Sequence, residues 1–130
     1  MLSVIDELPG HVVGIHTVGR ITGKDIKNTL EPLLNSMAGT QQEVNYLLLA
    51  ESGLADFTVG AMLAYSMLII KYYARWNKVA VVTDDNMIRS ITRFFRFLIP
   101  GISRQFNLNE MDKAIQWIAR KDIKLNTYDD

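Results

Sequence analysis

Cysteine is absent from this 130-residue chain, and neither sign of charge is in excess, because 14 lysines and arginines balance 14 aspartates and glutamates. Without thiols the chain can form no disulfide, thiolate nucleophile, zinc ribbon or iron–sulfur site, which favours a cytoplasmic location. Zero net charge provides no overall field that would attract nucleic acid or a membrane surface. We therefore expect no nucleic-acid partner, and an electrostatic partner would have to recognise a local patch.

A long hydrophobic run is also missing. The longest stretch without a charged side chain, residues 57–70, has fourteen residues, whereas a membrane-spanning helix needs about 17–25. The first ten residues carry Asp6 and Glu7 and lack the basic start and apolar run of a secretory signal. The sequence predicts neither a transmembrane segment nor a signal peptide.

What is present is an ordinary globular composition, with 48% apolar and 22% charged residues. A domain of this size buries about two thirds of the surface that its unfolded chain exposes. We expect one domain over residues 1–125 and a flexible tail over residues 126–130.

Apolar, β-branched runs alternate with helical patterns along the chain. A hairpin turned at Pro9-Gly10 precedes predicted strands over residues 44–50, 79–82 and 103–108. Helices are predicted over residues 22–39, 60–76, 86–98 and 110–121. Such alternation implies right-handed crossovers, and therefore an α/β fold with a mainly parallel sheet, an antiparallel amino-terminal hairpin and about four helices.

The predicted helix ends follow from capping chemistry. Thr22, Asn86 and Asn109 are the expected amino-terminal caps, because short polar side chains accept hydrogen bonds from free N–H groups there. Gly39 is the expected stop of the first helix. Pro32 is the weak point of that helix, since an interior proline loses a hydrogen bond.

Several short patterns occur in a defined order along nearly the whole chain. They are Val12-Val13-Gly14, Thr22-Gly23-Lys24-Asp25, the strand at residues 44–50 followed by Asp56 and Gly60-Ala61, Lys78-Val79-Ala80-Val81-Val82, Arg93-Phe94-Phe95-Arg96-Phe97 before Pro100, and Phe106 with Glu110, Ala114 and Trp117-Ile118. In this order they resemble the SpoIIAA-like family, the STAS and CRAL-TRIO-related group of small bacterial proteins. The resemblance implies a SpoIIAA-like (STAS-like) fold.

The resemblance also implies a candidate switch. In STAS anti-sigma-factor antagonists, a serine just after an aspartate, where the central strand meets its helix, is phosphorylated to switch partner binding. The matching aspartate here is Asp56, but Phe57 follows it and has no hydroxyl. Thr58 is then the residue of this loop that could carry a phosphate, at the amino terminus of a helix.

Polar side chains follow the predicted central strands, where ligands bind in open parallel sheets. The loop residues expected to gather there are Glu51, Ser52, Asp56, Phe57, Thr58, Thr83, Asp84 and Asp85. Their carboxylates could hold a divalent cation, or they could cap helices and turns, and the strong preference of aspartate for caps favours the second interpretation. Neither a phosphate-binding loop nor a dinucleotide fingerprint occurs, so we assign no metal and no cofactor.

The second predicted helix is apolar on two faces. One candidate interface follows the i, i+3, i+4 rule and comprises Met62, Tyr65, Ile69, Tyr72 and Trp76. One sheet covers only one face of a helix, so the other face needs a neighbouring helix, a second subunit or an apolar ligand. Homodimerisation through this face is one prediction, and cover within the chain is its alternative.

The third predicted helix has a basic side. Arg89, Arg93 and Arg96 follow one another at helical spacing, Arg104 lies beyond them, and no acid occurs from residue 86 to residue 109. A basic amphipathic helix can contact anionic lipid, a partner helix or phosphates, whereas the alternative is a solvated face whose arginines pair with nearby acids.

Two functions from different classes fit these features. The first is a non-enzymatic STAS-like regulatory or protein-interaction module, acting as a homodimer. The alternative is a carrier for a small apolar molecule such as a lipid, as CRAL-TRIO kinship would imply, with a pocket of about 300–1,000 Å³ under the second and third helices. A metal-assisted hydrolase using Asp56 and Asp84 is a third possibility, but no nucleophile and base stand at recognisable spacing, so we expect no catalytic residue.

Overall fold

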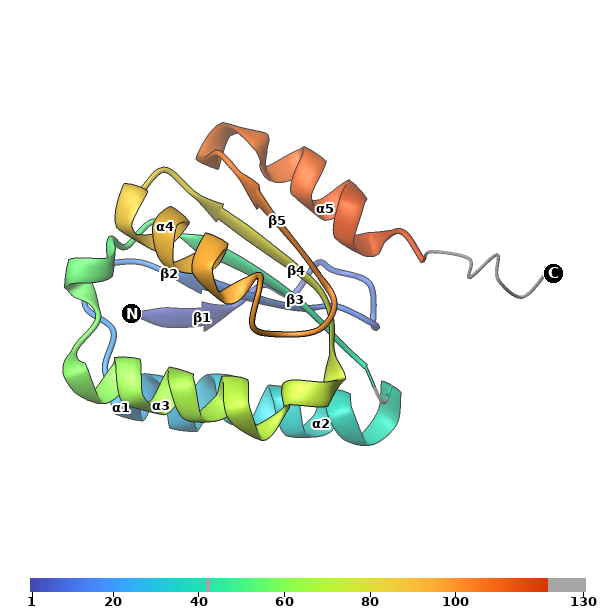
Figure 1. Cartoon of the computed structure of the whole chain (residues 1–130), viewed down its shortest axis with the longest axis horizontal. Coiled ribbons are helices and arrows are strands. Elements are labelled where there is room, and N and C mark those ends of the chain that lie inside the picture. The colour runs from blue at the N-terminus through green and yellow to red at the C-terminus, as the bar shows by residue number, and fades with distance from the viewer. Residues whose placement is uncertain (42, 122–130) are drawn as a thin grey trace, which may run out of the picture.

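The protein has an α/β fold, in which a five-stranded sheet carries helices on both faces (Figure 1). The computed structural model describes residues 1–41 and 43–121, so the predicted tail at residues 126–130 lies outside the described residues. The strands, in both chain order and sheet order, are β1 (Leu2–Val4), β2 (Val13–Thr17), β3 (Val44–Ala50), β4 (Trp76–Thr83) and β5 (Ile102–Phe106). Only the pair formed by β1 and β2 is antiparallel, which confirms the predicted fold class.

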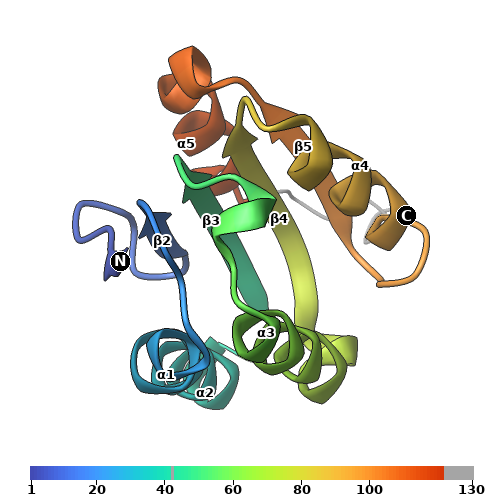
Figure 2. The ribbon, with the colours of Figure 1, turned by 90° about the vertical axis from the view of Figure 1, so that its left-hand side faces the viewer.

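The helices lie in two layers. They are α1 (Gly23–Asp25), which continues through a π-helical turn over Ile26–Leu30 into α2 (Glu31–Gln41), then α3 (Val59–Lys71), α4 (Asn86–Phe95) and α5 (Met111–Ala119). The crossovers through α1–α2, α3 and α4 lie on one face of the sheet, and α5 lies on the other (Figure 2). This segregation is expected, because β3, β4 and β5 are each added at the same edge of the sheet. Right-handed crossovers that all run in one direction place their helices on one face.

Side chains of the central strands point alternately to the two faces of the sheet and so contribute to two apolar cores. In β3, Tyr46 and Leu48 belong to the apolar cluster under α1–α4, whereas Leu47 belongs to the cluster under α5. Successive side chains of a strand point to opposite faces, so a nearly continuous apolar run is what a strand covered on both faces requires.

The first helix begins as predicted. The N–H of Asp25 donates to Thr22 Oγ1 at 3.3 Å, and the Asp25 carboxylate accepts from the N–H of Thr22 at 2.8 Å. The π-helical turn ends at Leu30, and Pro32 follows after Glu31; the missing N–H and bulky ring of this proline interrupt a regular helical ladder. The predicted stop at Gly39 was wrong, because α2 runs on to Gln41 and Gly39 lacks the positive φ angle that makes a glycine stop useful.

The second predicted helix also ends elsewhere. Instead of continuing to Trp76, α3 stops at Lys71, and a single 3-10 turn over Tyr73–Arg75 leads into β4. Trp76 is the first residue of β4 and pairs with Val44 of β3. The helical spacing of apolar residues continues past the end of α3 because Tyr72 and Trp76 are both buried. Tyr72 lies at the end of the helix, whereas Trp76 already belongs to the strand.

Two predicted caps shift by one or two residues. Asp85, not Asn86, caps α4, since its carboxylate accepts from the N–H of Ile88 at 3.0 Å. Asn107, not Asn109, precedes the last helical segment, a 3-10 turn that leads into α5, and its N–H donates to the Glu110 carboxylate at 2.8 Å. Both Asp85 and Asn107 have the extended backbone that is typical of a residue at a helix start.

The apolar stretch at residues 57–70 mostly forms α3. None of the helices in residues 1–41 and 43–121 is both long enough and apolar enough to cross a bilayer.

Candidate functional site

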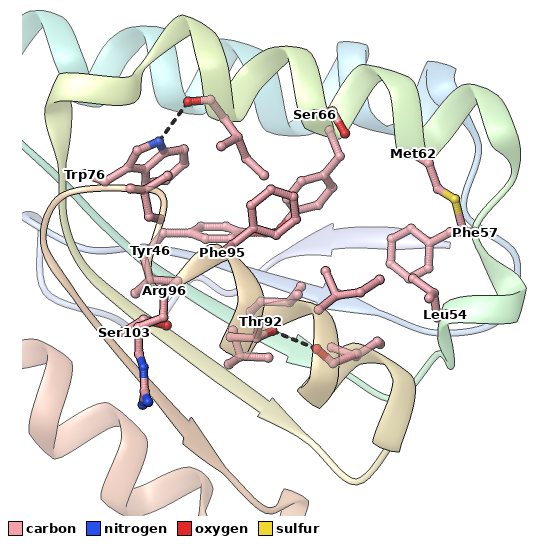
Figure 3. A pocket seen from close by; sticks show the side chains of 18 residues that line it. Tyr46, Leu54, Phe57, Met62, Ser66, Trp76, Thr92, Phe95, Arg96 and Ser103 are labelled. Atoms are coloured by element: carbon pink, nitrogen blue, oxygen red, sulfur yellow. Dashed lines mark hydrogen bonds between the residues drawn. The ribbon is translucent and has the colours of Figure 1, made fainter.

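A cavity of about 330 Å³ lies between α3 and α4, over β3 and β4, on the face of the sheet that these two helices cover (Figure 3). Its floor consists of alternate residues of the two strands, including Tyr46, Leu48 and Val81, which all point to the same face of the sheet. One wall is the flank of α3 that carries Met62, Tyr65, Ser66 and Ile69, and the other is the flank of α4 that carries Ile88, Ile91 and Phe95. The site is therefore built almost wholly from apolar side chains.

One end of the cavity is aromatic and contains buried hydroxyls. The hydroxyls of Tyr46 and Tyr65 are hydrogen-bonded to each other. The centroids of the Tyr46 and Trp76 rings lie 6.1 Å apart. The indole N–H of Trp76 donates to the carbonyl of Ile69 at 3.1 Å, which fixes the ring against α3. Figure 3 places Leu54, Phe57 and Met62 at the opposite end.

Burial controls the charge of this tyrosine pair. Removal from water raises the pKa of the Tyr46 hydroxyl well above its usual value of 10, and the neighbouring Tyr65 adds to that effect. Burial likewise raises the pKa of Tyr65. Both hydroxyls are therefore neutral at physiological pH and can donate or accept hydrogen bonds but not carry charge.

The candidate interface of the second helix faces this cavity and the core. Tyr72 and Trp76 are 7% and 6% exposed, Tyr65 and Ile69 are half-buried cavity walls, and Met62 lies at the rim. The prediction that these five residues form a surface for a second copy is wrong for most of them, because that face is largely covered within the chain. A different stripe of α3 is exposed, and it comprises Val59, Leu63, Met67 and Ile70.

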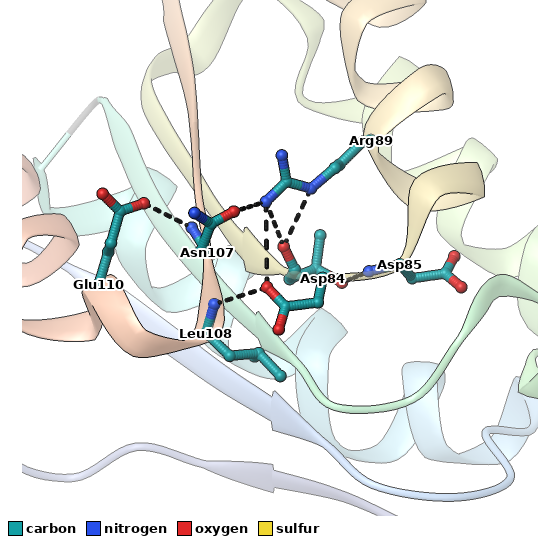
Figure 4. Close-up of polar contacts among 7 residues, drawn as sticks. Asp84, Asp85, Arg89, Asn107, Leu108 and Glu110 are labelled. Atoms are coloured by element: carbon teal, nitrogen blue, oxygen red, sulfur yellow. Dashed lines mark hydrogen bonds and ion pairs between the residues drawn. The ribbon is translucent and has the colours of Figure 1, made fainter.

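Two acids of the candidate binding loop, Asp56 and Asp85, lie together at Gly53 and Leu54, whereas Asp84 does not join them. The Asp56 carboxylate accepts from the N–H of Gly53 at 2.8 Å, and Asp85 accepts from Ile88 and from Leu54, which joins the loops after β3 and β4. Asp84 lies apart, toward β5, where it accepts from the N–H of Leu108 at 3.0 Å (Figure 4). These contacts are caps and turn contacts, and the described residues contain no group of acids and histidines suited to a metal ion.

The hydroxyls of that loop also have structural partners. Thr58 caps α3, since its Oγ1 accepts from the N–H of Ala61 at 3.0 Å. Thr83 is fully buried and its Oγ1 accepts from the N–H of Asp85 at 3.0 Å. Phe57, the residue in the place of the family's serine, lines the cavity instead. Phosphorylation of Thr58 stays a prediction.

The predicted basic patch is split between the two faces of the sheet. Arg89 donates to the carbonyl of Thr83 through Nε and Nη2, and also to the side chain of Asn107, so it ties α4 to the ends of β4 and β5 (Figure 4). Arg104 stacks on the rings of Phe106 and Trp117, on the α5 face. Arg104 is therefore not part of a patch with the α4 arginines, because its alternation along β5 places it on the other face of the sheet.

Arg93, in α4, and Arg96, directly after its last residue, stay exposed. The guanidinium of Arg96 lies 5.7 Å from the ring centre of Phe97. Although Arg96 contributes to the cavity rim, Figure 3 shows its guanidinium directed away from Phe95 and Tyr46. The inner part of the cavity therefore has no cationic group close to the tyrosine pair.

Two important residues were missed from the sequence. The strand pattern predicts Tyr46 only as a member of a buried strand, although a phenol in a largely apolar run indicates a hydroxyl that needs a partner in the core. Lys78 is 3% exposed, and its ammonium donates to the carbonyls of Trp117 and Arg120 at 3.2 and 2.6 Å, at the end of α5. A lysine within a β-branched run was the corresponding signal, since buried cations need partners.

Comparison with known proteins places this architecture in a family. No curated protein sequence matches the chain significantly. An uncharacterised protein of the DUF3478 family from Shewanella loihica PV-4, with a SpoIIAA-like fold, is similar in structure, with a TM-score of 0.66 and 18% sequence identity over 90% of this chain and 93% of that chain. The family model described as SpoIIAA-like matches residues 12–119. The chain belongs to the SpoIIAA-like family.

Proposed function

We propose that the protein binds a small apolar molecule in the cavity between α3 and α4. The observation that carries this proposal is the cavity itself, whose volume of about 330 Å³ is that of a small-ligand site. Its lining is predominantly apolar, with the tyrosine pair at one end and Ser66 and Thr92 among the few other polar groups, which is the usual composition of a small-molecule site. The proposal rests on this geometry and not on kinship.

The hydrophobic effect favours an occupant. The cavity is partly open to solvent, and its walls are mainly apolar side chains such as Leu48, Ile69, Val81 and Ile88. Water that fills such a hollow finds few polar partners on these walls. An apolar molecule would cover this surface and release that water, which is favourable.

The same geometry supports binding without a chemical step. A catalytic site needs a nucleophile, base or metal within reach of a bound molecule. The acids and hydroxyls of the loops after β3 and β4, including Asp56, Asp85, Thr58 and Thr83, are engaged with backbone N–H groups as caps or turn contacts. Because these groups cap helices and turns, the proposed function is binding in the cavity and not catalysis by these loops.

Dye binding tests this function. N-phenyl-1-naphthylamine is a neutral dye that fluoresces when it leaves water, and we expect it to bind the protein at micromolar concentration. Replacing Ser66, an exposed cavity-wall residue, with tryptophan should weaken binding by at least about tenfold, equivalent to about 1.4 kcal/mol, because the indole occupies the opening.

Ser90→Trp is the matched control, since Ser90 is an exposed residue of α4 that does not line the cavity. It introduces the same side chain and should leave the affinity unchanged. Absence of dye binding to the unmodified protein, or an equal loss in both variants, would contradict the proposed function.

A second candidate function is a regulatory contact module that acts through self-association. Its specific support is the exposed stripe of α3, in which Val59, Leu63, Met67 and Ile70 are 73%, 62%, 68% and 73% exposed. Soluble monomers seldom expose a contiguous stripe of this kind, and two copies related by a two-fold axis would bring equivalent side chains together.

Sedimentation velocity tests self-association. We expect the protein to form dimers at micromolar concentration, and Ile70→Glu to raise the dimer dissociation constant at least about tenfold, because each copy would bury an unpaired carboxylate. Asn35→Glu places the same charge on an exposed position of α2 and should have no effect. A monomeric unmodified protein would rule out this candidate while leaving ligand binding untouched.

A further inference from the structure

We propose that the Tyr46–Tyr65 pair makes the cavity selective for a neutral molecule that carries a hydrogen-bond acceptor, such as a ketone or ester carbonyl oxygen, at one end of an apolar body. The inference rests on the proposed function and names the class of ligand that the site recognises. The acceptor would lie at the tyrosine end of the cavity, and the apolar body would extend toward Leu54 and Phe57.

A count of protons carries the inference. Each phenol has one proton to donate, and the single hydrogen bond between the two hydroxyls uses one of them. The hydroxyl that accepts this bond keeps its own proton, for which the described residues provide no further hydrogen-bond acceptor. Tyr46 is 3% exposed and Tyr65 is half-buried, so water reaches the pair mainly through the mouth of the cavity. A ligand oxygen would supply the missing acceptor.

The surroundings favour a neutral acceptor over an anion. The walls near the pair are the rings of Trp76 and Phe95 and the side chain of Ile69, and none of them carries charge. Among the described residues that line the cavity, Arg96 is the cation, and its guanidinium points away from the pair (Figure 3). Placing an unpaired carboxylate in such surroundings costs far more than placing a carbonyl that receives one hydrogen bond.

Structural need does not account for the pair. Two phenylalanines would fill the same space and need no hydrogen bonds, and replacing both partners of a buried hydrogen bond with apolar groups of the same shape is nearly neutral for stability. Two buried hydroxyls therefore contribute little to the fold that two phenyl rings would not. What they add is a hydrogen-bond donor in the lining of an apolar site.

The test uses two compounds of the same shape. 2-Acetonaphthone has a carbonyl oxygen where 2-isopropenylnaphthalene has a methylene group, and each is titrated as a competitor of N-phenyl-1-naphthylamine. In the unmodified protein, the ratio of the two affinities should favour the ketone about tenfold more than it does in the double variant Tyr46→Phe/Tyr65→Phe. Comparing ratios cancels the different hydration of the compounds. The double variant is needed because either hydroxyl left alone can still donate.

Tyr73→Phe is the control, since Tyr73 is 52% exposed and lies outside the cavity. It should keep the ratio of the unmodified protein. A ratio that is the same in the double variant would overturn the inference and leave the proposed function standing. Failure of both compounds and the dye to bind would overturn the two together.

A second measurement needs no variant and covers the case in which the double variant does not fold. The carbonyl stretching band of bound 2-acetonaphthone should move to lower frequency than in hexane, as in a hydrogen-bonding solvent. A bound ketone whose band stays at the hexane position would overturn the inference.

Discussion

Replacing Gly101 with alanine is expected to lower the free energy of unfolding by at least about 3 kcal/mol. Gly101 has a φ angle of 96°, a region that side chains with a Cβ rarely enter. A Cβ built there would lie 2.5 Å from the carbonyl oxygen of Asn77 and 2.6 Å from that of Trp76. Both contacts are with backbone, so relief requires moving the start of β4 or of β5. Urea denaturation measures the change.

Gly39→Ala is the matched control with the opposite sign. Gly39 lies inside α2, its φ angle is not positive, and nothing lies within 4 Å of an added Cβ. Alanine there should raise the free energy of unfolding by about 0.5–1 kcal/mol, since it restricts the unfolded chain and favours the helix. Equal stability of the two variants would contradict the close approach described at Gly101.

Trp76→Ala should cost about 3–5 kcal/mol of the free energy of unfolding, the usual range for deleting a buried aromatic ring. The ring is 6% exposed, contacts Tyr46, and donates to the carbonyl of Ile69. Its loss leaves that carbonyl without its side-chain donor and enlarges the aromatic end of the cavity. Thermal and urea denaturation both measure the loss.

Phe97→Ala is the control for this change. Phe97 is 82% exposed, so its removal should alter stability by no more than about 0.5 kcal/mol. A variant of Trp76 as stable as that control would mean that the ring does not hold α3 against the sheet. Trp76→Phe keeps most of the apolar surface and should recover a large part of the stability, which separates packing from the hydrogen bond to Ile69.

Trp76 and Gly101 act at the same end of the molecule. The loop before β5 passes close to the first residues of β4 because Gly101 has no side chain, and Trp76 at that strand end forms part of the cavity lining. Ile99 and Ser103, on either side of Gly101 in the chain, also line the cavity. A backbone shift at Gly101 should therefore change ligand affinity as well as stability.

Local chemistry in the chain was enough to predict the hairpin, the parallel strands and the capping box of Thr22 and Asp25. Each depends on residues close in sequence, or on an alternation of side chains that has a single period. The same kind of evidence misplaced the end of α3, because Trp76 continues a helical spacing and yet pairs with Val44 in the sheet. A buried tryptophan fits both a helical and a strand pattern of apolar residues. Its pairing with the distant strand β3 decides in favour of the strand.

The candidate site depended still more on distant contacts. Nothing in the spacing of residues 62–76 separates a dimer face from a cavity wall, since both require apolar side chains at helical intervals. Arg104 looked like a neighbour of the α4 arginines until its place in β5 put it under α5. Tyr46 and Tyr65 meet across nineteen positions of sequence, and their meeting depends on how α3 lies over β3. Composition and short-range pattern determine which elements form and which faces are apolar, whereas the packing of those elements determines which apolar face encloses a space, because a cavity belongs to the arrangement of several segments and to none of them alone.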